Sequence, residues 1–346
     1  MIIFADNQVQ KMASFEEFPD EIMLKVIKFL NIKDLIKFGH VSKRMRKISS
    51  DQSLWQKMNF SKVSPAYMIY DFGVPTDFLK MVIENGCKYL SLHYQINFGF
   101  PDLCLEKPSS LRYLDLKDFR GKEKTFEEIL ASCYSLQKLA IYLKSLTPNM
   151  IRCIGYQNGH TLQTLNLSYC SELDLKSIQI ITKHCVELKN VDLAATRLSK
   201  DSINCLVTNL TPKIEKMDLG YLCNLKDEHL KVLVARCNKL SVLNLRNTSI
   251  TNDSLTHIIE NLQLTLEKLN VDIPYGIITY VKLTELKSMP KLNSLKFRGN
   301  NHEKEDLKNI MPLVKFDEKI TADERKLLPA DGIWDVKAKH LNFSSS

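Results

Sequence analysis

The chain has 346 residues, 44% apolar and 25% charged, which suits a soluble globular protein of two domains or one long repeat array. Its net charge of +8 is modest and no basic arm stands out, which argues against nucleic-acid binding. The nine cysteines include no C-x-x-C pair for zinc or redox chemistry, and no stretch approaches the roughly 18 apolar residues of a membrane span. We therefore expect a cytoplasmic and/or nuclear protein with no cofactor, no metal and no membrane partner.

Residues 1–14 show no periodicity and predict a flexible leader, whereas residues 15–60 predict a domain of three or four short helices. The first helix begins at Pro19, which two acidic residues follow, and the second should be stopped by Gly39. The fourth should run from Asp51, as its N-cap, through Met58. The apolar residues of this segment exceed what so small a bundle can bury, so we expect another protein to cover some of them.

Four motifs of this segment, in order and at the right spacing, resemble an F-box: Phe18-Pro-Asp-Glu-Ile22, Leu30 to Leu35, Val41 to Arg44, and Asp51 to Trp55. Three positions depart from the F-box pattern, because Phe18 replaces a leucine, Ser42 a cysteine and Met45 a tryptophan. A capping bundle for the repeats that follow is the alternative interpretation. The resemblance implies docking on a Skp-family adaptor, for which the candidate residues are Pro19, Asp20, Ile22, Leu24, Ile27, Leu30, Asp34, Leu35, Val41, Leu54 and Trp55.

Residues 61–86 predict a linker and a first capping segment, with a short helix from Thr76 to Ile83. The pattern L-x-x-L-x-L then recurs about eight to ten times through residues 87–316. Strong copies follow one another after 25 and then repeatedly after 26 residues, within the range of leucine-rich repeats. These copies begin at Leu111, Leu136, Leu162, Leu188, Ile214, Leu240, Leu266 and Leu292.

Each repeat predicts a short strand and then a helix, because apolar residues recur at i, i+3, i+4 and i+7 in its second half. The predicted fold class is α+β: an N-terminal F-box domain of three or four helices, followed by a curved α/β leucine-rich-repeat solenoid with parallel strands on its concave face. The cysteines that recur at fixed repeat positions predict core packing rather than catalysis. They resemble the cysteine-containing subclass of leucine-rich repeats, and they are Cys133, Cys170, Cys185, Cys223 and Cys237.

The concave face is the one large hollow that this architecture builds, and so it is the candidate surface for a protein substrate. An ordinary solvated face is the alternative for any single residue. Lysines and Arg298 favour a phosphorylated ligand, whereas Asp192 and Asp218 argue against one. The candidate residues are Tyr113, Asp115, Thr164, Asn166, Asn190, Asp192, Lys216, Asp218, Asn244, Lys268, Asn270, Lys296 and Arg298.

The chain leaves the repeat period near Asn300, and Met311 to Phe316 predicts one last strand. Residues 317–346 predict a tail in which Trp334 is conspicuous. Trp334 either packs over the repeats or meets a partner, or else the tail covers the apolar end of the last repeat. The tail is similar to that of some F-box/leucine-rich-repeat proteins, which implies a path along the concave face and a small accessory subunit that helps to hold a phosphorylated substrate.

No phosphate-binding loop, dinucleotide fingerprint, nucleophile elbow or metalloprotease motif is present, so the sequence favours a non-catalytic protein. The F-box resemblance implies the substrate-recognition subunit of an SCF-type (Skp-cullin-F-box) E3 ubiquitin ligase, which joins a substrate to a cullin-RING ligase for proteasomal degradation. The alternative is a leucine-rich-repeat interaction scaffold that is not coupled to ubiquitin ligation.

Overall fold

The computed structural model describes residues 17–30, 32–59, 76–92, 104–116, 123–274 and 276–316. The chain divides into two compact units, with the boundary between Gln56 and Lys57. We refer to the described residues before this boundary as the helical unit and to those after it as the repeat unit.

The described part of the helical unit holds four helices, α1 (Asp20–Ile27), α2 (Ile32–Val41), α3 (Lys43–Ser49) and α4 (Gln52–Trp55). The Ser42 hydroxyl accepts a hydrogen bond from the Met45 amide and caps α3, while the Asp51 carboxylate caps α4 through the Ser53 amide. The predicted helical F-box domain is confirmed. Its buried apolar side chains are Met23, Ile27, Leu35, Met45, Ile48 and Trp55.

Two sequence predictions for this segment are wrong. Helix α2 continues past Gly39, which was expected to end it. A Cβ atom at residue 39 would lie 2.6 Å from the Ser49 hydroxyl oxygen, so the close approach of α2 and α3 favours glycine there, and a turn does not. Met58 does not belong to the fourth helix, which ends at Trp55. It lies in a short strand, Lys57–Asn59, that pairs with the first strand of the repeats.

The repeat unit is built on one eleven-stranded parallel sheet, in which the strands follow their order in the sequence. Each strand therefore pairs with those of the preceding and following repeats, and the sheet does not close. The strands are β1 (Lys57–Asn59), β2 (Tyr89–Ser91), β3 (Tyr113–Leu116), β4 (Lys138–Ile141), β5 (Thr164–Asn166), β6 (Asn190–Asp192), β7 (Lys216–Asp218), β8 (Val242–Asn244), β9 (Lys268–Val271), β10 (Ser294–Phe297) and β11 (Lys315–Phe316).

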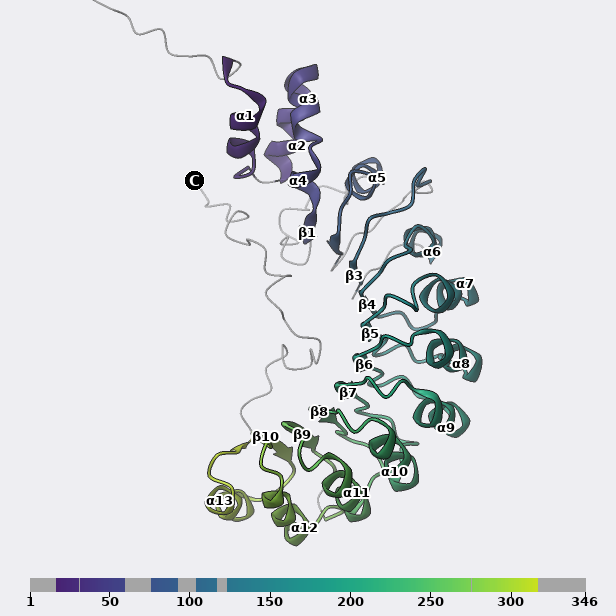
Figure 1. Cartoon of the computed structure of the whole chain (residues 1–346), viewed down its shortest axis with the longest axis vertical. Coiled ribbons are helices and arrows are strands. Elements are labelled where there is room, and N and C mark those ends of the chain that lie inside the picture. Colours follow the sequence, from purple (N-terminus) through teal and green to yellow (C-terminus); the bar gives the residue numbers. More distant parts are fainter. Residues whose placement is uncertain are drawn as a thin grey trace, which may run out of the picture. The chain divides into compact units, whose positions relative to one another are not determined.

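Helices form the outer layer of the repeat unit and strands line its inner side, which confirms the predicted curved solenoid (Figure 1). The Thr164–Asn166 copy shows the reason, because Leu162, Leu165 and Leu167 are all fully buried between the two layers. The helices are α5 (Thr76–Glu84), α6 (Glu123–Ala131), α7 (Pro148–Arg152) with the π-helical turn η3 (Cys153–Gln157), α8 (Leu175–His184), α9 (Lys200–Asn209), α10 (Asp227–Arg236), α11 (Asn252–Leu262), α12 (Tyr280–Thr284) with the 3-10 turn η4 (Glu285–Ser288), and α13 (Asn301–Ile310).

The cysteine prediction holds for four of the five recurring positions. Cys133, Cys170, Cys185 and Cys237 are buried, but Cys223 is exposed in the turn after β7. At the end of the array helix α13 lies between β10 and β11, and Lys315 pairs with Ser294 after 21 residues, so the chain leaves the 26-residue period where the sequence predicted it. An Asn300–Glu303 capping box starts this helix, and the last strand is limited to two residues, β11.

Candidate functional site

The helical unit exposes apolar side chains as well as burying them. Phe18, Ile22, Val26 and Phe29 are spaced by four, four and three residues, which places them on one side of α1 and its flanks. Each is at least 39% exposed, and Val41 on α2 is 67% exposed. We call these five exposed residues together, four on α1 and its flanks and one at the end of α2, the apolar face. Exposed apolar patches of this kind mark protein-binding surfaces.

The predicted adaptor-binding residues have three different environments. Ile27, Leu35 and Trp55 are buried in the core of the bundle. The Trp55 ring N–H donates to the Ser49 carbonyl oxygen at 2.6 Å, which fixes the ring within the core. Of the others, Leu24, Leu30 and Leu54 are half-buried, and the exposed ones are Pro19, Asp20, Ile22, Asp34 and Val41.

Asp20 has a partner within the helical unit. Arg44 donates to the Asp20 carboxylate from Nε at 2.9 Å and from Nη2 at 2.7 Å, and it reaches the Phe18 carbonyl oxygen at 2.7 Å. This fork ties α3 to the start of α1. Val26 and Phe29 were absent from the predicted site, although their helical spacing from Ile22 was the signal that could have identified them.

The concave face of the sheet carries side chains in three rows, because residues two apart on a strand share a face and the strands pair in register. The first row is Lys57, Tyr89, Tyr113, Lys138, Thr164, Asn190, Lys216, Val242, Lys268 and Ser294. The second row is Ser91, Asp115, Ala140, Asn166, Asp192, Asp218, Asn244, Asn270 and Lys296. The third row continues beyond the strand ends with Ser168, Ala194, Gly220, Arg246, Asp272 and Arg298.

The amides and carboxylates of the second row end the strands. Asn166 accepts a hydrogen bond from the Ser168 backbone amide at 2.9 Å, and Asp192 accepts one from the Ala194 backbone amide at 3.0 Å, in each case two residues further on. Asn166 also donates to the Asp192 carboxylate at 2.9 Å across the strand pair. The same pattern recurs at Asp218, Asn244 and Asn270.

The structure therefore gives the centre of the predicted substrate site a structural role. Thr164, Asn166, Asp192 and Asp218 are buried, and their polar atoms bond to neighbouring repeats, so their part in substrate binding stays a prediction. Repetition in the sequence could not distinguish a ladder of mutual bonds from a free surface. The remaining predicted residues are half-buried, namely Tyr113, Asp115, Asn190, Lys216, Asn244, Asn270 and Lys296, or exposed, namely Lys268 and Arg298.

Asp218 is the most strongly perturbed carboxyl of this ladder. Burial raises the pKa of Asp218 to about 6, although the Gly220 amide and the Asn244 side chain both donate to its carboxylate at 2.8 Å. Its in-register neighbour on β6 is the carboxylate of Asp192. Burial therefore raises the free energy of the ionised form of Asp218 relative to its protonated form.

The first row begins with an aromatic cluster at β1–β4. The rings of Tyr89 and Tyr113 stack with centroids 4.4 Å apart and an interplanar angle of 16°. The Lys57 ammonium lies 5.1 Å from the Tyr89 centroid, and that of Lys138 lies 5.2 Å from the Tyr113 centroid. Lys57 and Tyr89 were missed by sequence reasoning, because β1 precedes the periodic region and the first copy of the pattern is weak.

The third row ends in two arginines joined by one carboxylate. Arg298 Nε donates to Asp272 Oδ1 at 3.0 Å, and Arg246 Nε lies 3.4 Å from Asp272 Oδ2. The Arg246 guanidinium is also 5.3 Å from the centroid of the Tyr221 ring. Arg246 was not among the predicted site residues, but its distance of 52 positions, or two repeats, from Arg298 was a usable signal.

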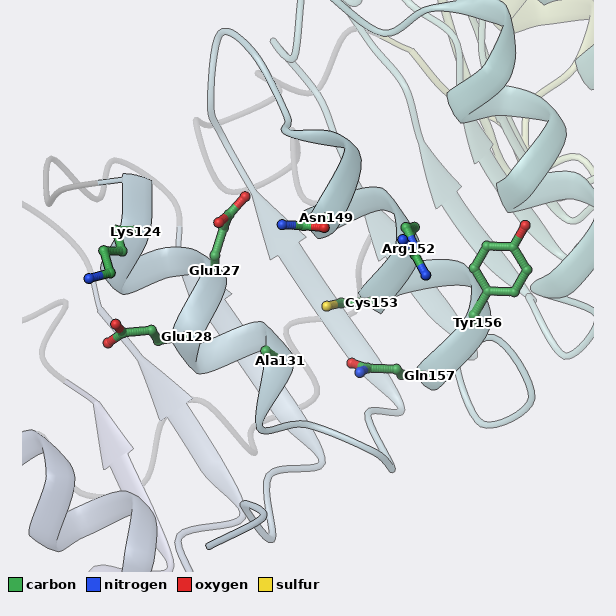
Figure 2. Close-up of a pocket in the computed structure, with 9 residues that line it drawn as sticks. All are labelled: Lys124, Glu127, Glu128, Ala131, Asn149, Arg152, Cys153, Tyr156 and Gln157. Atoms are coloured by element: carbon green, nitrogen blue, oxygen red, sulfur yellow. The ribbon is translucent and has the colours of Figure 1, made fainter. Parts of the chain in front are cut away.

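A groove of about 510 Å³ opens between helices of the outer layer (Figure 2). Lys124, Glu127 and Glu128 of α6 line one side, and the other side comes from α7 and η3. The groove contains none of the residues predicted from sequence, and its walls carry charges of both signs. In the part of the chain that the structure describes, no group of three or more His, Cys, Asp or Glu side chains is arranged to hold a metal ion.

Two further expectations concern other parts of the chain. Trp334 and the rest of the predicted tail lie outside the described residues. Among the helices that the structure describes, none is long and apolar enough to cross a membrane.

Comparison with known proteins gives matches to both units. Residues 79–323 match the family described as the SKP2 LRR domain, and residues 15–61 match the F-box-like family. The F-box/LRR-repeat protein 5 of Xenopus laevis is 24% identical over 206 residues, covering 58% of this chain and 27% of that protein. The F-box protein FBW2 of Arabidopsis thaliana is 28% identical over 144 residues, covering 40% of this chain and 44% of that protein. The chain thus spans less than half the length of either relative.

A solved structure of the Rad7–Elc1 complex of yeast contains a similar fold. It has a TM-score of 0.51 and 13% sequence identity, and the match covers 78% of this chain and 62% of that chain. The family matches confirm the resemblance that the helical motifs and the 26-residue period indicated.

Proposed function

We infer the function of this chain from the family to which it belongs, that of the SKP2 LRR domain, together with its F-box-like segment. The chain is the substrate-recognition subunit of an SCF-type E3 ubiquitin ligase. The helical unit docks on a Skp-family adaptor and, through it, on a cullin-RING ligase. The repeat unit holds a protein substrate on its concave face. The complex acts in the cytoplasm or nucleus.

The observation that carries this proposal is the apolar face of the helical unit. Ile22, Val26 and Val41 are large apolar side chains at the surface of a bundle that already has its own core. Burying the exposed part of one such side chain contributes about 1 kcal/mol, so the whole face supplies on the order of 5 kcal/mol toward association. That is enough to anchor an adaptor once polar contacts around the rim add to it.

The role requires no chemistry from this chain, and F-box/LRR proteins are in general non-catalytic adaptors. Holding a substrate beside a ubiquitin-loaded enzyme raises the effective concentration of its lysines, and this proximity replaces an encounter in solution. The requirement is geometric. One surface must retain the ligase while another retains the substrate.

Binding to a purified Skp-family adaptor tests the proposal. Val26→Asp with Val41→Asp places two charges on the apolar face, and we expect the affinity for the adaptor to fall at least 100-fold. Val186→Asp with Val281→Asp is the matched control, because these valines of the repeat unit are 46% and 71% exposed, against 46% and 67% for the test pair. Absence of adaptor binding by the unmodified chain would exclude the function.

The departures from the F-box pattern at Ser42 and Met45 bear on the alternative of a scaffold that is not coupled to ligation. Both residues have roles inside the helical unit, since Ser42 caps α3 and Met45 is buried. Neither belongs to the apolar face. These internal roles support the ligase function over the scaffold, because neither departure alters the apolar face.

A further inference from the structure

The outer layer of the repeat unit contains a second groove, where α7 with η3, α8 and α9 lie side by side (Figure 1). Its volume is about 650 Å³, and it shares Tyr156 with the groove of Figure 2. Helix α8 supplies most of its lining, with Tyr156 of η3 on one side and Cys205 and Asn209 of α9 on the other. We call this surface the α8 groove.

The α8 groove carries positive charge and no carboxylate. Its lining includes the exposed Lys176 and Lys183 and the half-buried His184, but no Asp or Glu. Neither α8 nor α7 with η3 contains an acidic residue, although α5, α6, α9, α10, α11 and α13 each contain at least one. The lack of carboxylates is therefore a property of these two neighbouring helices and not of the outer layer in general.

The two lysines of the α8 groove have no ion-pair partner among the described residues. Elsewhere in the outer layer a lysine pairs with a carboxylate of the next helix, as Lys200 of α9 does with Glu228 of α10 at 3.3 Å. Lys176 and Lys183 form no such pair with a described residue. Lys176 is near Asp174, but that carboxylate caps the start of α8 and does not line the groove. A ligand in the groove thus meets two cations.

An apolar strip lies beside and between the two lysines. Ile180 is half-buried, and Tyr156 is 57% exposed with its ring centroid 4.3 Å from that of His184. Glycine at residue 155 lets η3 approach α8, because a Cβ atom there would lie 2.4 Å from Cγ2 of Ile180. This close approach places Tyr156 next to α8. Exposed apolar side chains with cations at their rim are typical of a surface that binds protein.

The spacing of the lysines indicates the shape of the partner. Lys176 and Lys183 are seven residues, or two turns, apart, so they lie on one face of α8 about 10.5 Å from each other along its axis. A helix lying along α8 presents its residues i and i+7 with the same separation, and its residues i+3 and i+4 then face Ile180 and Tyr156. An extended segment does not fit, because residues three apart span about 10 Å but point to opposite faces.

We propose that the α8 groove binds an amphipathic helix of a partner protein, in which acidic residues seven positions apart flank apolar residues. The carboxylates pair with Lys176 and Lys183, and the apolar side chains cover Tyr156 and Ile180. Charge complementarity identifies this occupant, because two cations without a carboxylate attract an acidic helix and repel a basic one. The groove belongs to the helical outer layer, so the inference goes beyond the proposed function and does not depend on it.

Binding of synthetic helical peptides to the full chain, measured by fluorescence polarisation at low salt, tests the assignment. The peptides are alanine-based, about four turns long and held helical by a side-chain cross-link on the face away from the groove. The first has glutamates seven residues apart with two leucines between them. The second has lysines in place of the glutamates. The third has its glutamates five residues apart, on different sides of the helix. We expect the first to bind at least about 10-fold more tightly than the others, and less tightly as salt is added.

Substitutions in the groove test which side chains bind the peptide. Lys176→Gln with Lys183→Gln should weaken binding of the first peptide about 10-fold, and Tyr156→Ala should weaken it several-fold. Lys231→Gln with Lys287→Gln is the matched control, because it removes the same charge from exposed positions of α10 and η4 and should leave binding unchanged. An equal loss in the control would show bulk charge attraction and overturn the inference, as would unchanged binding by the groove variants.

The peptide series contains the other outcomes that contradict the proposal. If the first peptide does not bind at about 1 mM, or binds no better than the second or third, the groove does not recognise an acidic helix in this register. The first peptide with a central proline and no cross-link cannot form the helix. Equal binding of this form would show that the groove accepts an extended acidic segment, which refutes the assignment of a helix.

Discussion

Replacing Asp218 by asparagine should stabilise the repeat unit at neutral pH and have much less effect at acid pH. Burial raises the pKa of the Asp218 carboxyl from 3.8 to about 6, so the folded chain binds a proton more tightly than the unfolded chain does. The stability that this carboxyl contributes is complete below pH 3.8 and is lost as the pH rises through about 6. At pH 7.5 the ionised carboxylate therefore costs about 3 kcal/mol, from two pKa units at 1.36 kcal/mol each.

Asparagine removes that cost but changes one hydrogen bond. The side-chain oxygen of the asparagine can still accept the hydrogen bond from the Gly220 amide. Its nitrogen would face the side-chain nitrogen of Asn244, and since both nitrogens are donors, that hydrogen bond is lost at a cost of about 1 kcal/mol. The net gain at pH 7.5 is about 2 kcal/mol, or about 4 °C in melting temperature. At pH 5 the unmodified protein has recovered about half of its loss by protonation, so the gain falls below 1 kcal/mol.

Differential scanning calorimetry of both proteins at pH 7.5 and pH 5 measures this difference. Asp306→Asn, which removes an exposed carboxylate from α13, is the control and should change the melting temperature by less than about 1 °C at either pH. A decrease of the melting temperature that is the same at both pH values would refute the reasoning, because Asp218 would then act through its hydrogen bonds and not through its buried charge.

Three further predictions follow from single side chains. Burial holds the pKa of His229 below 6.5, and its Nδ1 accepts from the Lys226 amide at the start of α10, so the stability from this cap is complete above pH 6.5 and is lost as the pH falls through the lowered pKa. The protection factor of the capped amide against hydrogen exchange should therefore be lower at pH 5 than at pH 7, and equal protection factors would contradict this. Gly39→Val would collide with Ser49 and should destabilise the helical unit by about 1–3 kcal/mol. The variant should therefore be cleaved faster in limited proteolysis, and an unchanged cleavage rate would mean that α2 and α3 can separate. Burial raises the pKa of Cys185 to about 12, so its reactive thiolate form is scarce at pH 8. Iodoacetamide should label the exposed Cys223 at pH 8 and leave Cys185 unmodified until the protein unfolds. Equal labelling of the two cysteines would show that the core opens.

The fold was largely predictable because it is local and repeated. Leu162, Leu165 and Leu167 can all face one interior when the segment forms a strand beside a layer of helices. The 26-residue spacing then places neighbouring repeats on either side, and these bury the leucines. Two features were not predictable, and each depends on a contact between separate elements of the chain. Gly39 is explained only by Ser49, and β1 exists because its residues pair with β2.

The candidate site was only partly predictable for the same reason. The period showed which residues would share a row, as it did for Asn166 and Asp192. It did not show that adjacent members of a row would bond to one another and become buried. The Arg246–Asp272–Arg298 arrangement likewise depends on how strands two repeats apart come into register.

The most direct test of the account asks whether capture by the repeat unit and ubiquitin ligation are coupled. Proteins captured from cells by the unmodified chain and by Val26→Asp with Val41→Asp should be the same, because the substitutions lie outside the repeat unit. Quantitative mass spectrometry of these captured proteins should show that ubiquitylated peptides are depleted, and total abundance raised, in cells that express the variant. Captured proteins with the same ubiquitylation and abundance in both cell lines would contradict a substrate-recognition subunit and leave only a scaffold.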